Sequence, residues 1–150
     1  MADKAPEPPS DIETRSLPLE VLSAGTLLFR IHSSVKSPKF FGRSKAWRFD
    51  SPDDSYGTLY LGMSAEACFA ETLLRGLNGF VARSELEIRS LCRFTVLREL
   101  QLVRLYGPHM MMLAATAGVT ANPDYGLCQR WSRALHLHAE ASDGILYKSN

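Results

Sequence analysis

The segment from Gly57 to Gly76 carries the strongest local signal in this chain. It reads GTLYLGMSAEACFAETLLRG, a short alternating run followed at once by a helical run that Ser64 can cap and Gly76 can end. A strand that leads by a tight turn into a helix requires a fold in which helices pack beside a sheet. Within that helix, Glu71 is a carboxylate among almost wholly apolar residues, and burying it costs several kcal/mol unless it is paired.

Two interpretations of Glu71 follow from the local pattern. In the first, Glu71 pairs with Arg75 one turn later on a half-exposed face, which stabilises a helix by roughly 0.3 to 0.5 kcal/mol. In the second, Glu71 stands at the wall of a pocket. There it acts as a general base or, remaining ionised, stabilises positive charge that develops on a substrate. Helix position alone slightly favours the pair with Arg75.

The other patterns follow one another in a mixed order. GTLLFRIH (25–32) alternates as a strand, with Leu27, Phe29 and Ile31 on one face and Arg30 on the other. The remaining segments predict, in order, an irregular connection (33–57), the strand (57–62), the helix (64–76), a short helix with a Ser84–Glu87 capping box, two strands (92–107), a loop (107–123), a helix beginning after the Asp124 cap, and a strand (143–147). This order predicts a single α+β domain with mixed or antiparallel sheets and flanking helices, because regular βαβ winding would alternate strands and helices.

Composition narrows the class of protein. With 150 residues, 45% hydrophobic residues and a formal net charge of +1, the chain is expected to form one globular domain without a general nucleic-acid-binding surface. The first twenty residues hold four of the eight prolines and no apolar signal-peptide core, so residues 1–24 are expected to be a flexible arm and 25–150 the folded body. No run approaches the roughly 20 apolar residues that span a bilayer, which favours a cytoplasmic protein without membrane contact.

The cysteines and histidines give no metal-binding pattern. Cys68, Cys92 and Cys128 are odd in number, far apart in sequence and set in apolar runs. Buried reduced thiols are therefore expected in place of disulfides, and neither a metal site nor a bound prosthetic group is predicted.

Two arginines are candidates for binding an anion. Arg30 lies on the less apolar face of its strand, and Arg48 lies in the run WRFD of the long connection. Each can be an ordinary surface charge, with Asp50 the natural partner of Arg48. Alternatively, each guanidinium can bind phosphate oxygens in a bidentate manner.

Tyr60 and Ser132 each have a structural and a functional interpretation. Tyr60 is either a packed strand aromatic or a stacking surface with a hydroxyl group. Ser132 and His136 lie four residues apart on one helix, which resembles a hydrolase pair. The run RWSRA, however, lacks the glycine-flanked turn that carries the nucleophile in such enzymes. Ser132 is therefore expected either to be a structural residue within the helix or to hydrogen-bond a substrate.

Six motifs in this order, LFRIH, RFD, YGTLYLG, CFAETLLR, YGLCQRWSRALH and DGILY, resemble the RES domain family over residues 25–149. The resemblance implies an ADP-ribosyltransferase-like fold and a toxin of a bacterial toxin–antitoxin pair that consumes NAD⁺ as substrate. It places the family's functional residues at Arg30, Tyr60, Glu71 and Ser132, with Arg48 as a second basic position.

The resemblance also implies roles for these residues. Glu71 would stand near the nicotinamide ribose, Arg30 and Arg48 on the pyrophosphate, and Tyr60 and Ser132 beside the ribose. Water as acceptor would make the protein a glycohydrolase, phosphate a phosphorylase and a protein side chain an ADP-ribosyltransferase.

Partners follow from the same resemblance. A helix-turn-helix antitoxin that blocks the pocket is expected, and self-association is also considered. The segment DGILYKS lies nearer the end of this chain than is common in the family, so a catalytically silent interaction domain is the rival hypothesis.

Overall fold

The strands form two separate sheets in the part of the chain that the computed structural model describes, residues 5–75 and 79–149. The sheets belong to two units, neither of which is contiguous in sequence. Unit 1 comprises the described residues of Met1–Leu22, Gly42–Thr58 and Glu99–Asn150, and unit 2 those of Ser23–Phe41 and Leu59–Arg98. The predicted α+β class with mixed and antiparallel sheets is confirmed.

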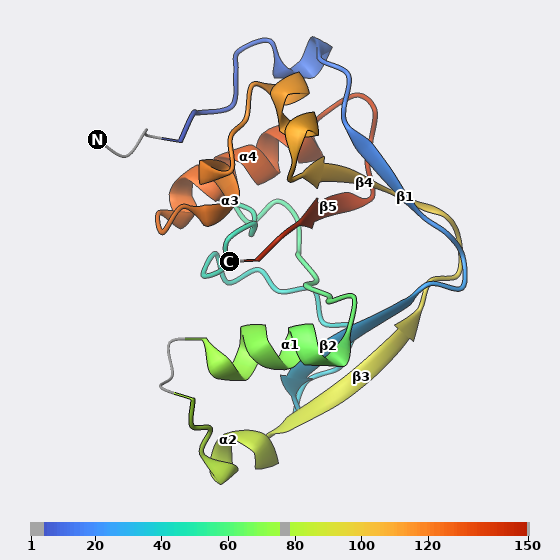
Figure 1. Cartoon of the computed structure of the whole chain (residues 1–150), viewed down its shortest axis with the longest axis vertical. Coiled ribbons are helices and arrows are strands. Elements are labelled where there is room, and N and C mark those ends of the chain that lie inside the picture. The colour runs from blue at the N-terminus through green and yellow to red at the C-terminus, as the bar shows by residue number, and fades with distance from the viewer. Residues whose placement is uncertain (1–4, 76–78, 150) are drawn as a thin grey trace. The chain divides into compact units, whose positions relative to one another are not determined.

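Unit 1 contains a mixed sheet in the order β1-β4-β5 (Figure 1). Its elements are η1 (Ile12–Thr14), β1 (Leu19–Leu22), β4 (Leu100–Leu105), η3 (Pro108–Leu113), α3 (Gly118–Ala121), α4 (Tyr125–His136) and β5 (Gly144–Tyr147). Strand β1 runs antiparallel to β4, whereas β5 runs parallel to it. The parallel pair is possible because α4 lies between the two strands in sequence and provides the long crossover that such a pair needs.

Helix α4 supplies the centre of the unit 1 core. Asp124 caps it by accepting a hydrogen bond from the backbone N–H of Gly126 at 2.9 Å. Leu127, Trp131 and Leu135, spaced three or four residues apart, are all buried, as the apolar stripe in the sequence predicts.

Unit 2 is built on a single antiparallel pair of strands. Its elements are β2 (Leu27–Ser33), α1 (Ala65–Phe69), the π-helical turn η2 (Ala70–Leu74), α2 (Arg83–Glu87) and β3 (Arg89–Thr95). Helix α1 lies beside β2 (Figure 1), and the Cys68 thiol donates a hydrogen bond to the carbonyl of Phe29 at 3.1 Å. Gly62 permits this close approach, because a Cβ there would lie 2.5 Å from the Cys68 sulfur.

Several sequence predictions are confirmed. Helix α1 begins after Ser64, whose hydroxyl accepts from the Ala67 N–H at 3.0 Å, and β2, β5 and α4 lie where the patterns place them. The 34–57 segment is irregular apart from one isolated bridge at Gly42. The expected end of the α1 helix at Gly76 lies outside the described residues.

Other predictions are wrong. The capping box at Ser84 does not form, because α2 begins after Ala82 and Ser84 is already inside the helix. The 107–123 segment is two short helices, η3 and α3, that bury Met110, Leu113 and Val119. These turns are too short for a helical period to show in the sequence.

The amino-terminal segment is also more ordered than composition predicts. Its apolar residues are spaced so that Ile12 and Leu17 are buried, and β1 then pairs with β4. The described part of 1–22 is thus packed into unit 1, contrary to the expectation of a flexible arm over 1–24.

The longest helix in 5–75 and 79–149 is α4, with 12 residues. Crossing a bilayer takes about 20 apolar residues, and none of the described helices is long and apolar enough to do so.

Candidate functional site

The residues singled out from the sequence are divided between the two units. Arg30, Tyr60 and Glu71 belong to unit 2, and Arg48 and Ser132 belong to unit 1.

Glu71 stands on the π-helical turn that continues α1. This turn spans Ala70–Leu74, and Glu71 is its second residue, with a half-buried side chain. Single π turns inside helices are rare and occur frequently at functional sites. The wider turn, and the extended backbone at Arg75 (φ −65°, ψ 118°), interrupt the α-helical spacing on which the expected Glu71–Arg75 pair depends. The pair with Arg75 and a functional role for Glu71 both stay predictions.

Tyr60 does not lie in a regular strand, which corrects the strand predicted over 57–62. Thr58 forms an isolated bridge with Gly42, and Gly62 forms another with Phe29. Because the two ends of the segment pair with different partners, no continuous ladder develops between them. Tyr60 lies between the two bridges and is half-buried.

Arg30 is bound to the backbone of the segment that follows its strand. Its Nη1 donates to the carbonyl of Pro38 at 2.6 Å and to that of Phe40 at 3.1 Å. Partial burial lowers the pKa of the Arg30 guanidinium below its ordinary value. Arginine has five N–H donors, and these contacts use those on one nitrogen. The guanidinium thus orders residues 38–40, and a role in anion binding stays a prediction.

Three segments of unit 2 meet at the residue before Arg30. The Phe29 carbonyl accepts from the Gly62 N–H at 2.8 Å and from the Cys68 thiol at 3.1 Å. Gly62 follows Tyr60 by two residues, and Cys68 precedes Glu71 by three. The backbone therefore brings the segments that carry Arg30, Tyr60 and Glu71 to one place on β2.

Arg48 anchors the 42–58 loop to the start of α4. Its Nη1 donates to the carbonyl of Asn122 at 2.8 Å and contacts the Cys128 sulfur at 3.9 Å. Its guanidinium carbon also lies 4.9 Å from the centre of the Tyr125 ring, a cation–π contact. These contacts hold the Arg48 side chain in place. Binding of a pyrophosphate by Arg48 stays a prediction.

Ser132 is buried, and its hydroxyl makes two short hydrogen bonds. It donates to the Phe49 carbonyl at 2.7 Å and lies 2.7 Å from the Tyr56 hydroxyl. The ring of His136 stacks on the Tyr56 ring, with centroids 4.0 Å apart. Tyr56 thus stands between the two members of the supposed serine–histidine pair, and this geometry gives the hydrolase hypothesis no support.

Tyr56 is a residue that the sequence analysis missed. The run SYGTLYLG contains two tyrosines, and only Tyr60 belongs to the alternating pattern that predicts a strand. Burial raises the pKa of the Tyr56 hydroxyl above its ordinary value. No local signal identifies it, because its hydrogen-bond partner, Ser132, is 76 residues away in sequence.

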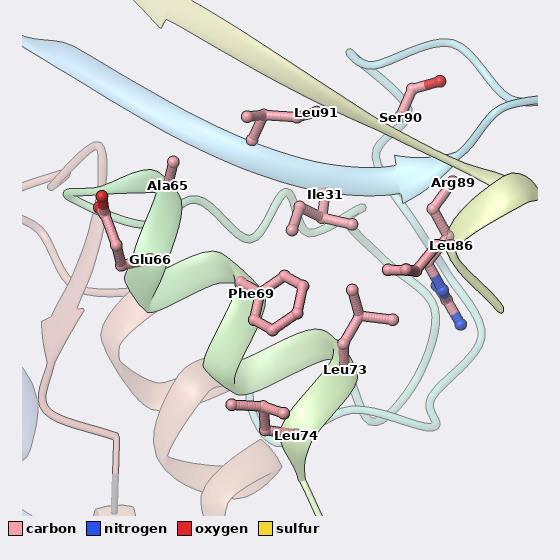
Figure 2. Close-up of a pocket in the computed structure, with 10 residues that line it drawn as sticks. All are labelled: Ile31, Ala65, Glu66, Phe69, Leu73, Leu74, Leu86, Arg89, Ser90 and Leu91. Atoms are coloured by element: carbon pink, nitrogen blue, oxygen red, sulfur yellow. The ribbon is translucent and has the colours of Figure 1, made fainter. Parts of the chain in front are cut away.

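Unit 2 also carries an open apolar groove of about 580 Å³. Figure 2 shows Ile31 of β2 and Phe69 of α1 pointing toward one another, with Leu86 and Arg89 near one end and Glu66 at the other. The groove is further lined by Ala65, Leu73, Leu74, Ser90 and Leu91. None of the five predicted site residues lines it, so it is a separate feature of this unit.

The cysteines are free thiols. Cys68 and Cys128 are buried, as expected, and Cys92 is half-buried. Burial raises the pKa of both buried thiols, which keeps them protonated and weakly nucleophilic. Within residues 5–75 and 79–149, no group of three or more His, Cys, Asp or Glu side chains could hold a metal ion.

Comparison with known proteins places this α+β chain in a family. The RES domain model matches residues 27–150, which is most of the sequence, and the chain therefore belongs to the RES domain family. No curated protein and no solved structure matches the chain. Membership confirms the resemblance drawn from the six ordered motifs and is consistent with a toxin-like, NAD-related domain.

Proposed function

We propose that this RES-domain protein is the NAD⁺-consuming toxin of a type II toxin–antitoxin pair and cleaves the N-glycosidic bond between nicotinamide and ribose. The observation that carries the proposal is the convergence of the Arg30, Tyr60 and Glu71 segments at the Phe29 carbonyl of unit 2. The family match supports the same proposal, and an ADP-ribosyltransferase-like arrangement is part of it.

Glu71 has the central chemical role. When the bond between ribose C1′ and the pyridinium nitrogen breaks, its electron pair passes to the nitrogen and nicotinamide leaves as a neutral base. The ribose becomes an oxocarbenium-like cation, which a nearby carboxylate stabilises. Glu71 is suited to this task because it is half-buried on a helix that the Ser64 cap and the Cys68 thiol fix in place.

The other residues bind and orient NAD⁺. Arg30 supplies a cation for the pyrophosphate, with Arg48 as the second. Tyr60 stacks on or orients the nicotinamide ribose. Ser132 was expected to donate a hydrogen bond to that ribose, but its proton is directed at the Phe49 carbonyl in this structure.

The acceptor decides the product. Water gives ADP-ribose, nicotinamide and a proton, whereas inorganic phosphate gives ADP-ribose 1″-phosphate and nicotinamide. A protein nucleophile would instead become ADP-ribosylated. We place the reaction in the cytoplasm, with a helix-turn-helix antitoxin as the controlling partner and self-association as a further interaction.

The first experiment measures nicotinamide release from NAD⁺, with and without phosphate. Glu71→Gln is expected to reduce turnover by on the order of 10²-fold or more, because the carboxylate charge is lost. Glu66→Gln is the matched control, since Glu66 is an exposed glutamate on the same helix. No release by wild type, or equal loss in both variants, would contradict the proposal. Faster release with phosphate identifies a phosphorylase.

A second candidate function is a catalytically silent interaction domain. The open apolar groove of unit 2 favours it, since exposed apolar surface of this kind is typical of protein interaction sites. Calorimetry with NAD⁺ separates the two functions. Binding that Arg30→Ala abolishes and Arg93→Ala preserves opposes the silent domain, because Arg93 is an exposed arginine on the neighbouring strand. Absence of NAD⁺ binding supports it.

A further inference from the structure

The hydrogen bonds at Ser132 have only one consistent direction. A serine hydroxyl has a single proton, and that of Ser132 is donated to the Phe49 carbonyl at 2.7 Å. The contact between Ser132 and Tyr56, also 2.7 Å, must then be donated by Tyr56. The result is a directed chain from the Tyr56 hydroxyl through Ser132 to the backbone of the 42–58 loop.

Helix α4 holds this loop at a second place on the same face. The Gln129 side-chain amide donates to the carbonyls of Lys45 and Trp47 at 2.9 and 3.0 Å. Gln129 and Ser132 are three residues apart, so they project from one side of the helix. Together they fix three alternate carbonyls, those of residues 45, 47 and 49, on either side of Arg48.

Tyr56 closes the far end of the loop onto the same helix. Its ring is stacked on His136, one turn beyond Ser132, and its hydroxyl bonds Ser132 itself. Ser132 is 5% exposed, so the chain of hydrogen bonds is shielded from water that would compete for it. A hydroxyl so engaged serves to hold a backbone segment and is not presented to a ligand.

We infer that Tyr56 is a positioning residue: through Ser132 it holds the Phe49 carbonyl and thereby fixes the loop that carries Arg48, the second cation proposed for the pyrophosphate of NAD⁺. This inference rests on the proposed function. It assigns Ser132 the same positioning role, in place of the ribose contact expected from the family resemblance.

The test is steady-state kinetics with NAD⁺ on Tyr56→Phe, Ser132→Ala, Arg48→Gln and the double variant Tyr56→Phe/Arg48→Gln. Arg48 would bind the pyrophosphate, a part of NAD⁺ that does not react. Displacing Arg48 therefore weakens the binding of the ground state and of the transition state equally. Each single variant is therefore expected to raise KM roughly tenfold with kcat changed by less than about twofold. The double variant should have the KM of Arg48→Gln alone, because both changes remove one interaction.

Tyr106→Phe is the matched control, since its hydroxyl donates to Glu20 elsewhere in unit 1 and it should keep the wild-type KM. A merely structural role for Tyr56 would lower the fraction of folded enzyme, and hence apparent kcat, without moving KM. That result would overturn the inference. So would KM effects that multiply in the double variant, or a loss of kcat confined to Ser132→Ala, which would place Ser132 at the reacting atoms.

Failure of the inference is distinguishable from failure of the proposed function. If wild type releases nicotinamide and Tyr56→Phe leaves KM unchanged, only the positioning role falls. If wild type releases none, both fall.

Discussion

The two units of this protein differ sharply in how well they are packed. In the described residues, every large side chain with less than 2% exposure belongs to unit 1, and these are Trp131, Leu105, Leu113, Leu135, Val103, Val119, Asp50 and Cys128. In the described part of unit 2, by contrast, the buried apolar side chains are Leu28, Cys68, Leu73 and Val96, each 5% to 8% exposed. Unit 1 has a fully buried core, whereas unit 2 is a strand pair packed against short helices with a few buried side chains.

Under the proposed function, the unit with the better-packed core is not the unit that carries the proposed reacting groups. A two-stranded ribbon is marginally stable by itself, and segments with few buried apolar contacts open most readily. Yet unit 2 carries Glu71, Arg30 and Tyr60. Unit 1 instead holds Arg48 and Ser132 in hydrogen bonds to backbone carbonyls. We expect the reacting groups to lie in the less stable unit and the rigid supports in the more stable one.

The largest expected effect compares two strand leucines, one in each unit. Leu105→Ala removes a side chain with 0% exposure from β4 and should reduce the free energy of unfolding by about 2 to 5 kcal/mol. Leu91→Ala removes one that is 56% exposed on β3 and should cost less than about 1 kcal/mol. Urea unfolding followed by circular dichroism measures both. Equal costs would show that the contrast between the units is wrong.

A smaller effect tests the close contact between Gly62 and the Cys68 thiol, which helps to hold α1 against β2 in unit 2. Gly62→Ala places a Cβ 2.5 Å from the Cys68 sulfur, so the thiol must rotate and give up its bond to Phe29. We expect a loss of about 1 to 3 kcal/mol in the free energy of unfolding. Adding Cys68→Ala should restore most of it, because the clash is then absent. A double variant no more stable than Gly62→Ala would mean that the strain lies elsewhere, for example against the Ser64 carbonyl at 3.4 Å.

The smallest expected effect is the pH dependence of stability that comes from the Tyr56 hydroxyl, which hydrogen-bonds Ser132 in unit 1. Burial raises the pKa of Tyr56 in the folded state above its ordinary value of 10.0. The unfolded chain therefore loses this proton first as pH rises, so the stability contributed by Tyr56 is complete below pH 10 and is lost as pH climbs through the raised pKa. Urea unfolding at pH 8 and pH 11 should show a smaller decrease in stability for Tyr56→Phe than for wild type. An identical decrease would contradict the burial of this hydroxyl.

Local patterns predicted those elements whose stability comes from nearby residues. The Ser64 and Asp124 caps and the apolar stripe of α4 depend on spacings of two to four residues, and all three are found. Strand β2 also forms, but the face predicted from its alternation is wrong, because Leu28 is buried and Leu27 is exposed. The predicted strand over 57–62 fails for a different reason. Its alternation is real, but a strand requires a continuous partner, and this segment pairs with Gly42 at one end and Phe29 at the other.

For the candidate site, too, local sequence patterns predicted some features, and others depend on tertiary contacts. Sequence analysis named Arg30, Arg48, Tyr60, Glu71 and Ser132, because six ordered motifs carry them, and the family match confirms that resemblance. It did not show that Glu71 lies on a π turn, because the run CFAETLLR has the spacing of an ordinary α-helix. Nor could it identify Tyr56, whose partner Ser132 is 76 residues away in sequence.

The sequence by itself determined the α+β class, the family, and which side chains carry charge and hydroxyl groups, because these depend on residue identity and short-range spacing. Only the tertiary structure decided what those groups contact. The Ser132 hydroxyl looked available to a substrate when read along its helix, and it is in fact committed to the Phe49 carbonyl and to Tyr56. Hydrogen-bond partners distant in sequence are fixed when the chain folds, and no local pattern encodes them.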